Sequence, residues 1–173
     1  MKNLPKKDYK TTTNGSLDPK TIVFMGNGLL FEKHMTHYNK GAAAERELIH
    51  RLFDAGFAVV RVAGSGKSSI PAPDILALSP RQKFCIEVKA VIAPHLFIPK
   101  YQLLELADWA NRAGICPLVA WKIPRDWFFL ALEDFHETGK NFGISRDTAA
   151  HQTTPFEVLI GKQTRLANKN NNA

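Results

Sequence analysis

The chain has 173 residues, of which 45% are hydrophobic and 23% are charged. This length and composition predict one globular domain with a substantial core, and they exclude a chain that is disordered throughout. The formal net charge of +7 is compatible with a polyanionic partner, but a basic balance alone does not establish one.

The chain divides into a basic arm, one folded domain and a polar tail. Residues 1–37 carry six lysines against three acidic residues and are rich in Thr, Asn and Gly, which is typical of a loosely ordered arm. Residues 38–165 hold the periodic apolar segments and predict the single domain. Residues 166–173 are polar and contain no packing material.

The first predicted element is a helix over Gly41–Gly56, which has strong helix formers and an apolar period of 3.6 residues. Glu45 interrupts the apolar stripe formed by Leu48, Ile49 and Leu52. A carboxylate on such a stripe costs free energy unless it is paired, protonated or bound to a metal. A position in the first turn also favours a carboxylate through the helix dipole, so both interpretations stay open.

A strand is predicted next over Phe57–Ala63, and Arg61 is its one charged residue. Arg61 either packs its stem at a strand edge or offers its guanidinium to a phosphate. The following loop, Gly64–Pro73, contains Gly66-Lys67-Ser68, which is similar to the end of a Walker A motif. Arg61 occupies the position of the first glycine of that motif, and two prolines prevent a long helix after it, so ATP binding is rejected. We expect a mobile polar loop that is open to a DNA contact.

Ile75–Leu78 and Lys83–Lys89 predict a β-hairpin, because Ser79–Gln82 between them has turn chemistry. If the last residue of the first strand pairs with the first residue of the second, Asp74 stands directly opposite Glu87. Their Cβ atoms would then be about 4.5–5.5 Å apart on one face.

Two carboxylates at this separation repel each other, so we expect a cation between Asp74 and Glu87. Lys89 points to the same face, because strand side chains alternate with a period of two. Ile86 and Val88 then face the core and define the register. A single carboxylate on a strand is usually a solvated surface charge, and the metal-site interpretation therefore depends on the whole combination.

The second half of the chain predicts a further helix and two strands. The predicted elements are an extended connection over Pro94–Pro99, a helix over Lys100–Ala113, strands over Ile115–Trp121 and Trp127–Leu132, and a short helix over Thr154–Gly161 at a subunit contact. The order αβββαββ predicts an α/β fold with a central mixed five-stranded sheet flanked by helices.

The remaining sequence features exclude some classes of protein. No apolar run approaches the ~18 residues of a membrane helix, and no apolar segment follows the first lysines as in a secretory signal. Cys85 and Cys116 lack the spacing of a zinc knuckle and are too few for a disulfide framework. We therefore expect a cytoplasmic protein.

An ordered series of motifs resembles the archaeal Holliday-junction resolvases, which belong to the PD-(D/E)xK nuclease superfamily. These motifs are Lys40-Gly41-Ala42-x-x-Glu45-Arg46-Glu47-Leu48, Val60-Arg61 followed by Ala63-Gly64-Ser65, Pro73-Asp74-Ile75, Ile86-Glu87-Val88-Lys89, and His95-Leu96. The resemblance extends from about residue 39 to residue 163 and implies a restriction-endonuclease-like core.

The resemblance also implies roles for individual side chains. Glu45, Asp74 and Glu87 correspond to the acidic metal-site residues, and Lys89 corresponds to the catalytic lysine. Ser65 is the counterpart of a loop serine implicated in catalysis or DNA handling. The predicted DNA-binding residues are Lys40, Arg46, Arg61, Ser65 and Lys67.

The implied activity is a homodimeric, structure-selective endonuclease that resolves four-way junctions in recombination and repair, associated with the nucleoid and with replication or recombination proteins. Independently of the resemblance, Asp74 and Glu87 are suited to hold one Mg²⁺, or two about 3.5–4 Å apart, and Mn²⁺ is the expected substitute. Lys89 would orient or activate the water.

Two other classes stay open at this point. One is another nuclease of the superfamily that acts on duplex or branched DNA. The other is a non-catalytic DNA-binding module in which Asp74, Glu87 and Lys89 form a structural salt-bridge cluster. A carboxylate-rich surface gains nothing in contact with phosphate, which argues against the second class.

Overall fold

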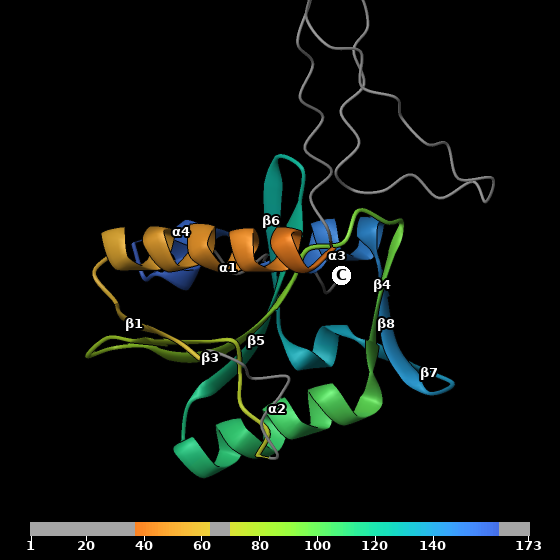
Figure 1. The fold of residues 1–173 in the computed structure, drawn as a ribbon, viewed down its shortest axis with the longest axis horizontal. Helices are drawn as coiled ribbons and strands as arrows, with labels where there is room; N and C mark the ends of the chain where they lie inside the picture. Colours follow the sequence, from red (N-terminus) through yellow and green to blue (C-terminus); the bar gives the residue numbers. More distant parts are fainter. Residues whose placement is uncertain (1–36, 63–69, 163–173) are drawn as a thin grey trace, which may run out of the picture. The chain divides into compact units, whose positions relative to one another are not determined.

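A five-stranded mixed sheet forms the centre of the folded domain (Figure 1). The computed structural model describes residues 37–62 and 70–162, within a unit that begins at His37. The predicted arm and tail and the middle of the polar loop, residues 63–69, lie outside the described residues. Within the described residues, no helix is both long and apolar enough to cross a lipid bilayer.

The described residues form the following helices and strands, in chain order. The elements are α1 (His37–Asp54), β1 (Ala58–Arg61), β2 (Ile75–Leu78), β3 (Lys83–Lys89), β4 (His95–Pro99), α2 (Lys100–Ala113), β5 (Cys116–Ile123), β6 (Asp126–Leu130), the 3₁₀ turn η2 (Leu132–Asp134), β7 (His136–Thr138), β8 (Asn141–Ser145), α3 (Arg146–Gln152) and α4 (Phe156–Leu159).

The central sheet has the strand order β1-β2-β3-β5-β6. Strands β3 and β5 are parallel, because α2 carries the chain back across the sheet between them, and every other neighbouring pair is antiparallel. The predicted mixed five-stranded sheet is therefore confirmed. The limits of β2 and β3 are those predicted, and the limits of β1, β5 and β6 differ from the predicted ones by one or two residues.

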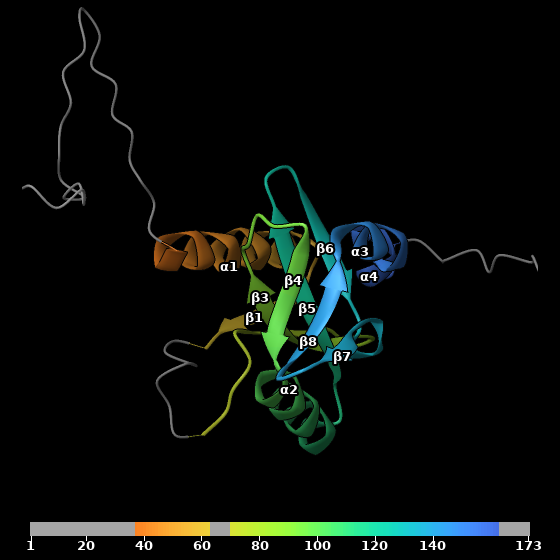
Figure 2. The same cartoon turned by 90° about the vertical axis from the view of Figure 1, so that its right-hand side faces the viewer.

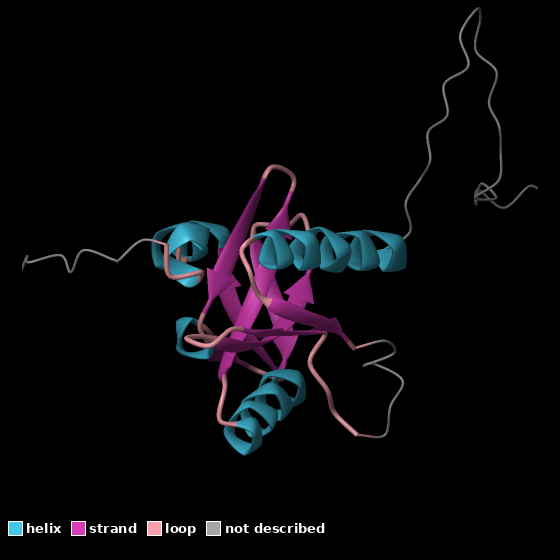
Figure 3. Ribbon diagram, turned by 90° about the vertical axis from the view of Figure 1, so that its left-hand side faces the viewer, coloured by secondary structure: helices cyan, strands magenta, loops and turns pink. Residues whose placement is uncertain are grey.

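Helices cover both faces of this sheet. Figures 1 and 3 both place α1 and α2 on opposite sides of the sheet. Leu48 and Leu52 of α1 pack with Ile86 of β3 in one core cluster, whereas Leu103 and Leu106 of α2 belong to a second cluster on the other side. Because β3 is covered on both faces, its residues 84–86 are all buried.

Helix α1 begins at His37, four residues before the predicted start, because its first turn has no apolar pattern from which a helix could be predicted. The predicted end is close to the observed one. Gly56 adopts φ +92°, a left-handed conformation that glycine accepts without steric cost. The backbone N–H of Phe57 then donates to the carbonyl of Leu52, which closes the turn into β1.

A second, three-stranded sheet, with the order β4-β8-β7, was not predicted. Figure 2 shows it in front of β5. Pro94–Pro99 was interpreted as an extended connection, but its residues pair with β8. The glycine in β8 is a weak strand former, yet it is required there, because a Cβ at Gly143 would lie 2.9 Å from ring carbons of Phe97.

Glu47 ties α1 to the β5–β6 hairpin. Its Oε1 accepts hydrogen bonds from Lys122 Nζ at 2.7 Å and from Trp127 Nε1 at 2.9 Å. Burial raises the pKa of Glu47, but the hydrogen bonds and positive charge of its partners outweigh this effect and hold the pKa below its usual value of 4.5. The ionised form of Glu47 is therefore the one that stabilises the fold.

We expect Glu47→Gln to lower the free energy of unfolding at pH 7 by about 0.5–1 kcal/mol, a modest value because Glu47 is partly exposed to solvent. A depressed pKa means that the contribution is present above pH 4.5 and is lost as the pH falls through the folded-state value. The difference from wild type should therefore shrink below that pH.

Urea unfolding across a pH series measures this difference, and Glu157→Gln, at an exposed position of α4, is the control. A difference that stays constant or grows toward acid pH would contradict the role of the Glu47 charge.

Candidate active site

The pairing of β2 with β3 places the predicted acidic residues. Leu78 pairs with Lys83 and Ile75 pairs with Ile86, which is the predicted register and continues to bring residue 74 opposite Glu87. Ile86 packs in the cluster beneath α1, whereas Cys85 belongs to the cluster on the α2 side. Alternation then sets Glu87 on the α2 side, together with residues 74 and 89.

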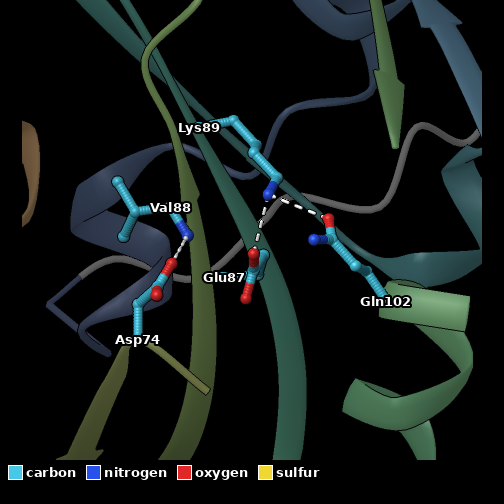
Figure 4. Close-up of polar contacts among 5 residues, drawn as sticks. All are labelled: Asp74, Glu87, Val88, Lys89 and Gln102. Carbon is cyan, nitrogen blue, oxygen red and sulfur yellow. Dashed lines mark hydrogen bonds and ion pairs between the residues drawn. The ribbon is translucent and has the colours of Figure 1, made fainter. Parts of the chain in front are cut away.

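Three polar contacts organise this face (Figure 4). Asp74 Oδ2 accepts a hydrogen bond from the backbone N–H of Val88 at 2.8 Å. Lys89 Nζ donates to Glu87 Oε1 at 2.7 Å and to Gln102 Oε1 at 3.1 Å. Asp74, directly before β2, contributes one carboxylate, and β3 contributes the carboxylate of Glu87 and the ammonium of Lys89. Helix α2 contributes an amide.

Glu87 is in an unfavourable position for a charge. Only 17% of its side chain is exposed, and burial raises its pKa above the usual value. The ammonium of Lys89 opposes this rise, while the negative charges of Asp74 and Glu45 add to it. The negative charges of the other two predicted acidic residues, Asp74 and Glu45, thus both act on Glu87. A cation bound there would relieve the repulsion.

Glu45 reaches the site from the other side of the sheet. It lies on α1, and its Oε2 accepts a hydrogen bond from Arg61 Nε of β1 at 2.6 Å. Its side chain is 18% exposed, so the pairing with Arg61 explains how a carboxylate is tolerated on the apolar stripe.

The described residues contain no group of three or more His, Cys, Asp or Glu side chains arranged to hold a metal ion. Asp74 and Glu45 both raise the pKa of Glu87 through their charge, but the three carboxylates do not form such a group.

The predicted DNA-binding residues are divided between two elements and the polar loop. Lys40 and Arg46 are exposed on α1, and Arg61 is exposed at the end of β1 beside Glu45. Ser65 and Lys67 lie outside the described residues, so their roles stay predictions. The three described residues are all basic and all on the elements nearest to Glu45.

Sequence reasoning missed Gln102. It is the third residue of α2, and nothing in its local sequence distinguishes it from a solvated helical glutamine. Its place beside Lys89 depends on how α2 packs across β3, which is a tertiary contact. The one sequence feature that could have pointed to Gln102 is its position in the first turn of the next helix after the Glu-x-Lys strand.

Comparisons with known proteins concern the family and the fold of the chain. The family model described as archaeal Holliday junction resolvase (Hjc) matches residues 36–167. The crossover junction endodeoxyribonuclease Hjc of Archaeoglobus fulgidus is 40% identical over 107 residues, which are 61% of this chain and 79% of that protein. The protein of the same name from Sulfurisphaera tokodaii is 33% identical over 113 residues, 64% of this chain and 78% of that one.

The solved structure of A. fulgidus Hjc, described as a Holliday junction resolvase from an archaeal hyperthermophile, superimposes with a TM-score of 0.65 and 33% identity. It covers 73% of this chain and 99% of that chain, which confirms the predicted restriction-endonuclease-like fold around the mixed sheet. Since the family model matches well over half of the chain and the fold agrees with it, the chain belongs to the archaeal Holliday junction resolvase family.

Proposed function

We propose that this chain is a structure-selective endonuclease that resolves four-way DNA junctions by metal-dependent hydrolysis of phosphodiester bonds. The observation that carries the proposal is the common face of Asp74, Glu87 and Lys89 at the ends of paired strands, in a chain of the resolvase family. The relatives' name, crossover junction endodeoxyribonuclease, supports the same substrate and reaction.

Asp74 and Glu87 are the residues that would hold the cation, with Glu45 as a further ligand or an outer carboxylate. Their donor atoms are hard oxygens, which favour Mg²⁺ or Mn²⁺ over zinc. When bound, one or two such ions would supply a water that is nucleophilic near neutral pH and would offset charge at phosphorus. The repulsion felt by Glu87 favours a cation at this position.

Lys89 is the proposed catalytic lysine. Its ammonium is held beside Glu87 on the face where the scissile phosphate would lie. There it would orient the attacking water and balance the negative charge that develops on the phosphate oxygens. Ser65 is proposed to assist from the polar loop, as the family resemblance implies.

DNA binding is assigned to the basic residues around the site. Lys40, Arg46 and Arg61 are exposed, and Lys67 is proposed to join them. Their contacts with the phosphate backbone predict that affinity falls as the salt concentration rises. A four-way junction needs two symmetric cuts, and the described residues of one chain form one such site, so we propose a homodimer that works with replication or recombination proteins in the cytoplasm.

Asp74→Asn and Glu87→Gln should each lower the cleavage rate by at least about 100-fold while junction affinity stays close to wild type. Both replacements keep an oxygen that accepts the local hydrogen bond, from Val88 N–H or from Lys89, so the fold is preserved. Gel assays on a synthetic four-way junction measure both quantities, and Glu105→Gln on the exposed side of α2 is the matched control. Loss of binding together with cleavage would indicate a structural role instead.

Cleavage should require Mg²⁺ or Mn²⁺ and should stop when EDTA is added, because the carboxylates alone cannot activate water. A competition between the four-way junction and a linear duplex of matched sequence tests the substrate. Preference for the junction supports the proposal, equal cleavage of duplex favours another nuclease of the superfamily, and no cleavage with either ion favours a DNA-binding module.

In metal-free buffer, Glu87→Gln should raise the melting temperature near pH 7, because it removes a charge that burial and neighbouring carboxylates disfavour. The raised pKa means that the cost in wild type is absent at low pH, grows as the pH rises from the unfolded-state value of about 4.5 toward the folded-state value, and is fully present above that. The gain should therefore disappear at low pH.

Added Mg²⁺ should stabilise wild type but not this variant, since only the native site binds the ion. Differential scanning fluorimetry with EDTA or Mg²⁺ measures both effects. A variant that is less stable than wild type without metal would contradict the account of Glu87.

A further inference from the structure

The contact between Lys89 and Gln102 joins β3 to the first turn of α2 (Figure 4). Lys89 Nζ lies 3.1 Å from Gln102 Oε1 and 2.7 Å from Glu87 Oε1. Lys89 keeps 22% of its side chain exposed, and Gln102 is half-buried. Of the three N–H donors of the ammonium, two are thus directed to acceptors within the described residues, and one is left for a water or a phosphate oxygen.

The start of α2 gives this contact a particular electrostatic setting. Pro99 precedes the helix without a capping side chain, and the first turn has no acidic residue. The N–H groups at this end carry the positive pole of the helix dipole, which alone does not attract an ammonium. The amide oxygen of Gln102 is the group of α2 that accepts a hydrogen bond from the ammonium of Lys89 and so holds it near the helix.

The contact gains importance if Glu87 holds a cation as proposed above. Oxygens that ligate a metal share their negative charge with it, so Glu87 then attracts Lys89 less strongly. The lysine stem has four flexible carbons, and the loss of one of two partners would let the ammonium leave its position. Gln102 is the partner that a metal ion would not draw away, because it is a neutral amide on another element.

A neutral acceptor also suits a site that must receive DNA. A glutamate at position 102 would pair with Lys89 and would be favoured by the helix dipole, but it would also add to the repulsion already felt by Glu87. It would also add a negative charge on the face that must accept a phosphate. The glutamine holds the ammonium without that charge.

We propose that Gln102 is a positioning residue that holds the ammonium of Lys89 toward the scissile phosphate. The proposal rests on the proposed function, in which Lys89 acts on that phosphate. Gln102 acts through Lys89 and has no part of its own in the reaction.

The test compares Gln102→Ala and Gln102→Glu with wild type, and Asn111→Ala, at an exposed amide of the same helix, is the matched control. Single-turnover cleavage of a four-way junction with Mg²⁺ gives the rate constant, and fluorescence anisotropy with Ca²⁺ in place of Mg²⁺ gives the affinity. Gln102→Ala should lower the rate constant by about 10–100-fold with affinity close to wild type. Gln102→Glu keeps an acceptor for Lys89 but should cleave more slowly, because it adds a negative charge on the face that receives the phosphate.

A second readout uses the protein with Mg²⁺ and without DNA, the state in which Lys89 is expected to depend on Gln102, and it needs no activity. In an NMR spectrum, the two Cε protons of a lysine held in one geometry have separate chemical shifts. The separation at Lys89, assigned with Lys89→Arg, should collapse in Gln102→Ala and persist in Asn111→Ala. A fold that is merely weakened would not change this one lysine alone.

Equal rate constants for wild type and Gln102→Ala, or an unchanged Lys89 signal, would overturn the role of Gln102. A Gln102→Glu variant that cleaves as fast as wild type would overturn the requirement for a neutral acceptor. A wild-type protein that cleaves no four-way junction with Mg²⁺ or Mn²⁺ would overturn the proposed function itself, which is a different result.

Discussion

The antiparallel pairing of β2 with β3 is the constraint on which the site depends. Because side chains alternate along a strand, this one register brings residue 74 opposite Glu87 and sets Lys89 on the same face. A slip by one residue would turn the charged Glu87 and Lys89 into the core beneath α1 and would remove Ile86 and Val88 from it. The apolar residues of β3 therefore maintain the chemistry indirectly, because their burial makes the slipped register unfavourable.

The same face concentrates charge at a cost in stability. Glu87 is largely buried, close to two other carboxylates, and its pKa is raised for that reason. Elsewhere the fold uses its charges for stability, as at Glu47, where two donors meet one carboxylate oxygen and the pKa is lowered. The pKa of Glu87 is raised and that of Glu47 is lowered. This difference distinguishes a residue suited to hold a cation, Glu87, from one that attaches a helix to a sheet, Glu47.

The local features of this chain were predictable from sequence, and the long-range ones were not. The β2–β3 register followed from strand length and turn residues, and the family followed from motifs around Glu45, Asp74 and Glu87. Strand β4 was missed because its partner β8 lies more than 40 residues later and contains Gly143, which sequence preferences count against a strand. Gln102 was missed for the same physical reason, since only the packing of α2 against β3 brings it to Lys89.

The central claim is that Asp74 and Glu87 share a cation beside Lys89 when DNA is bound. Anomalous X-ray scattering from Mn²⁺, in crystals of the protein with an uncleaved four-way junction, tests this claim most directly. The account predicts a manganese peak between these two carboxylates that also contacts a junction phosphate. A fully occupied manganese peak elsewhere, with Asp74 and Glu87 both away from it, would contradict the account.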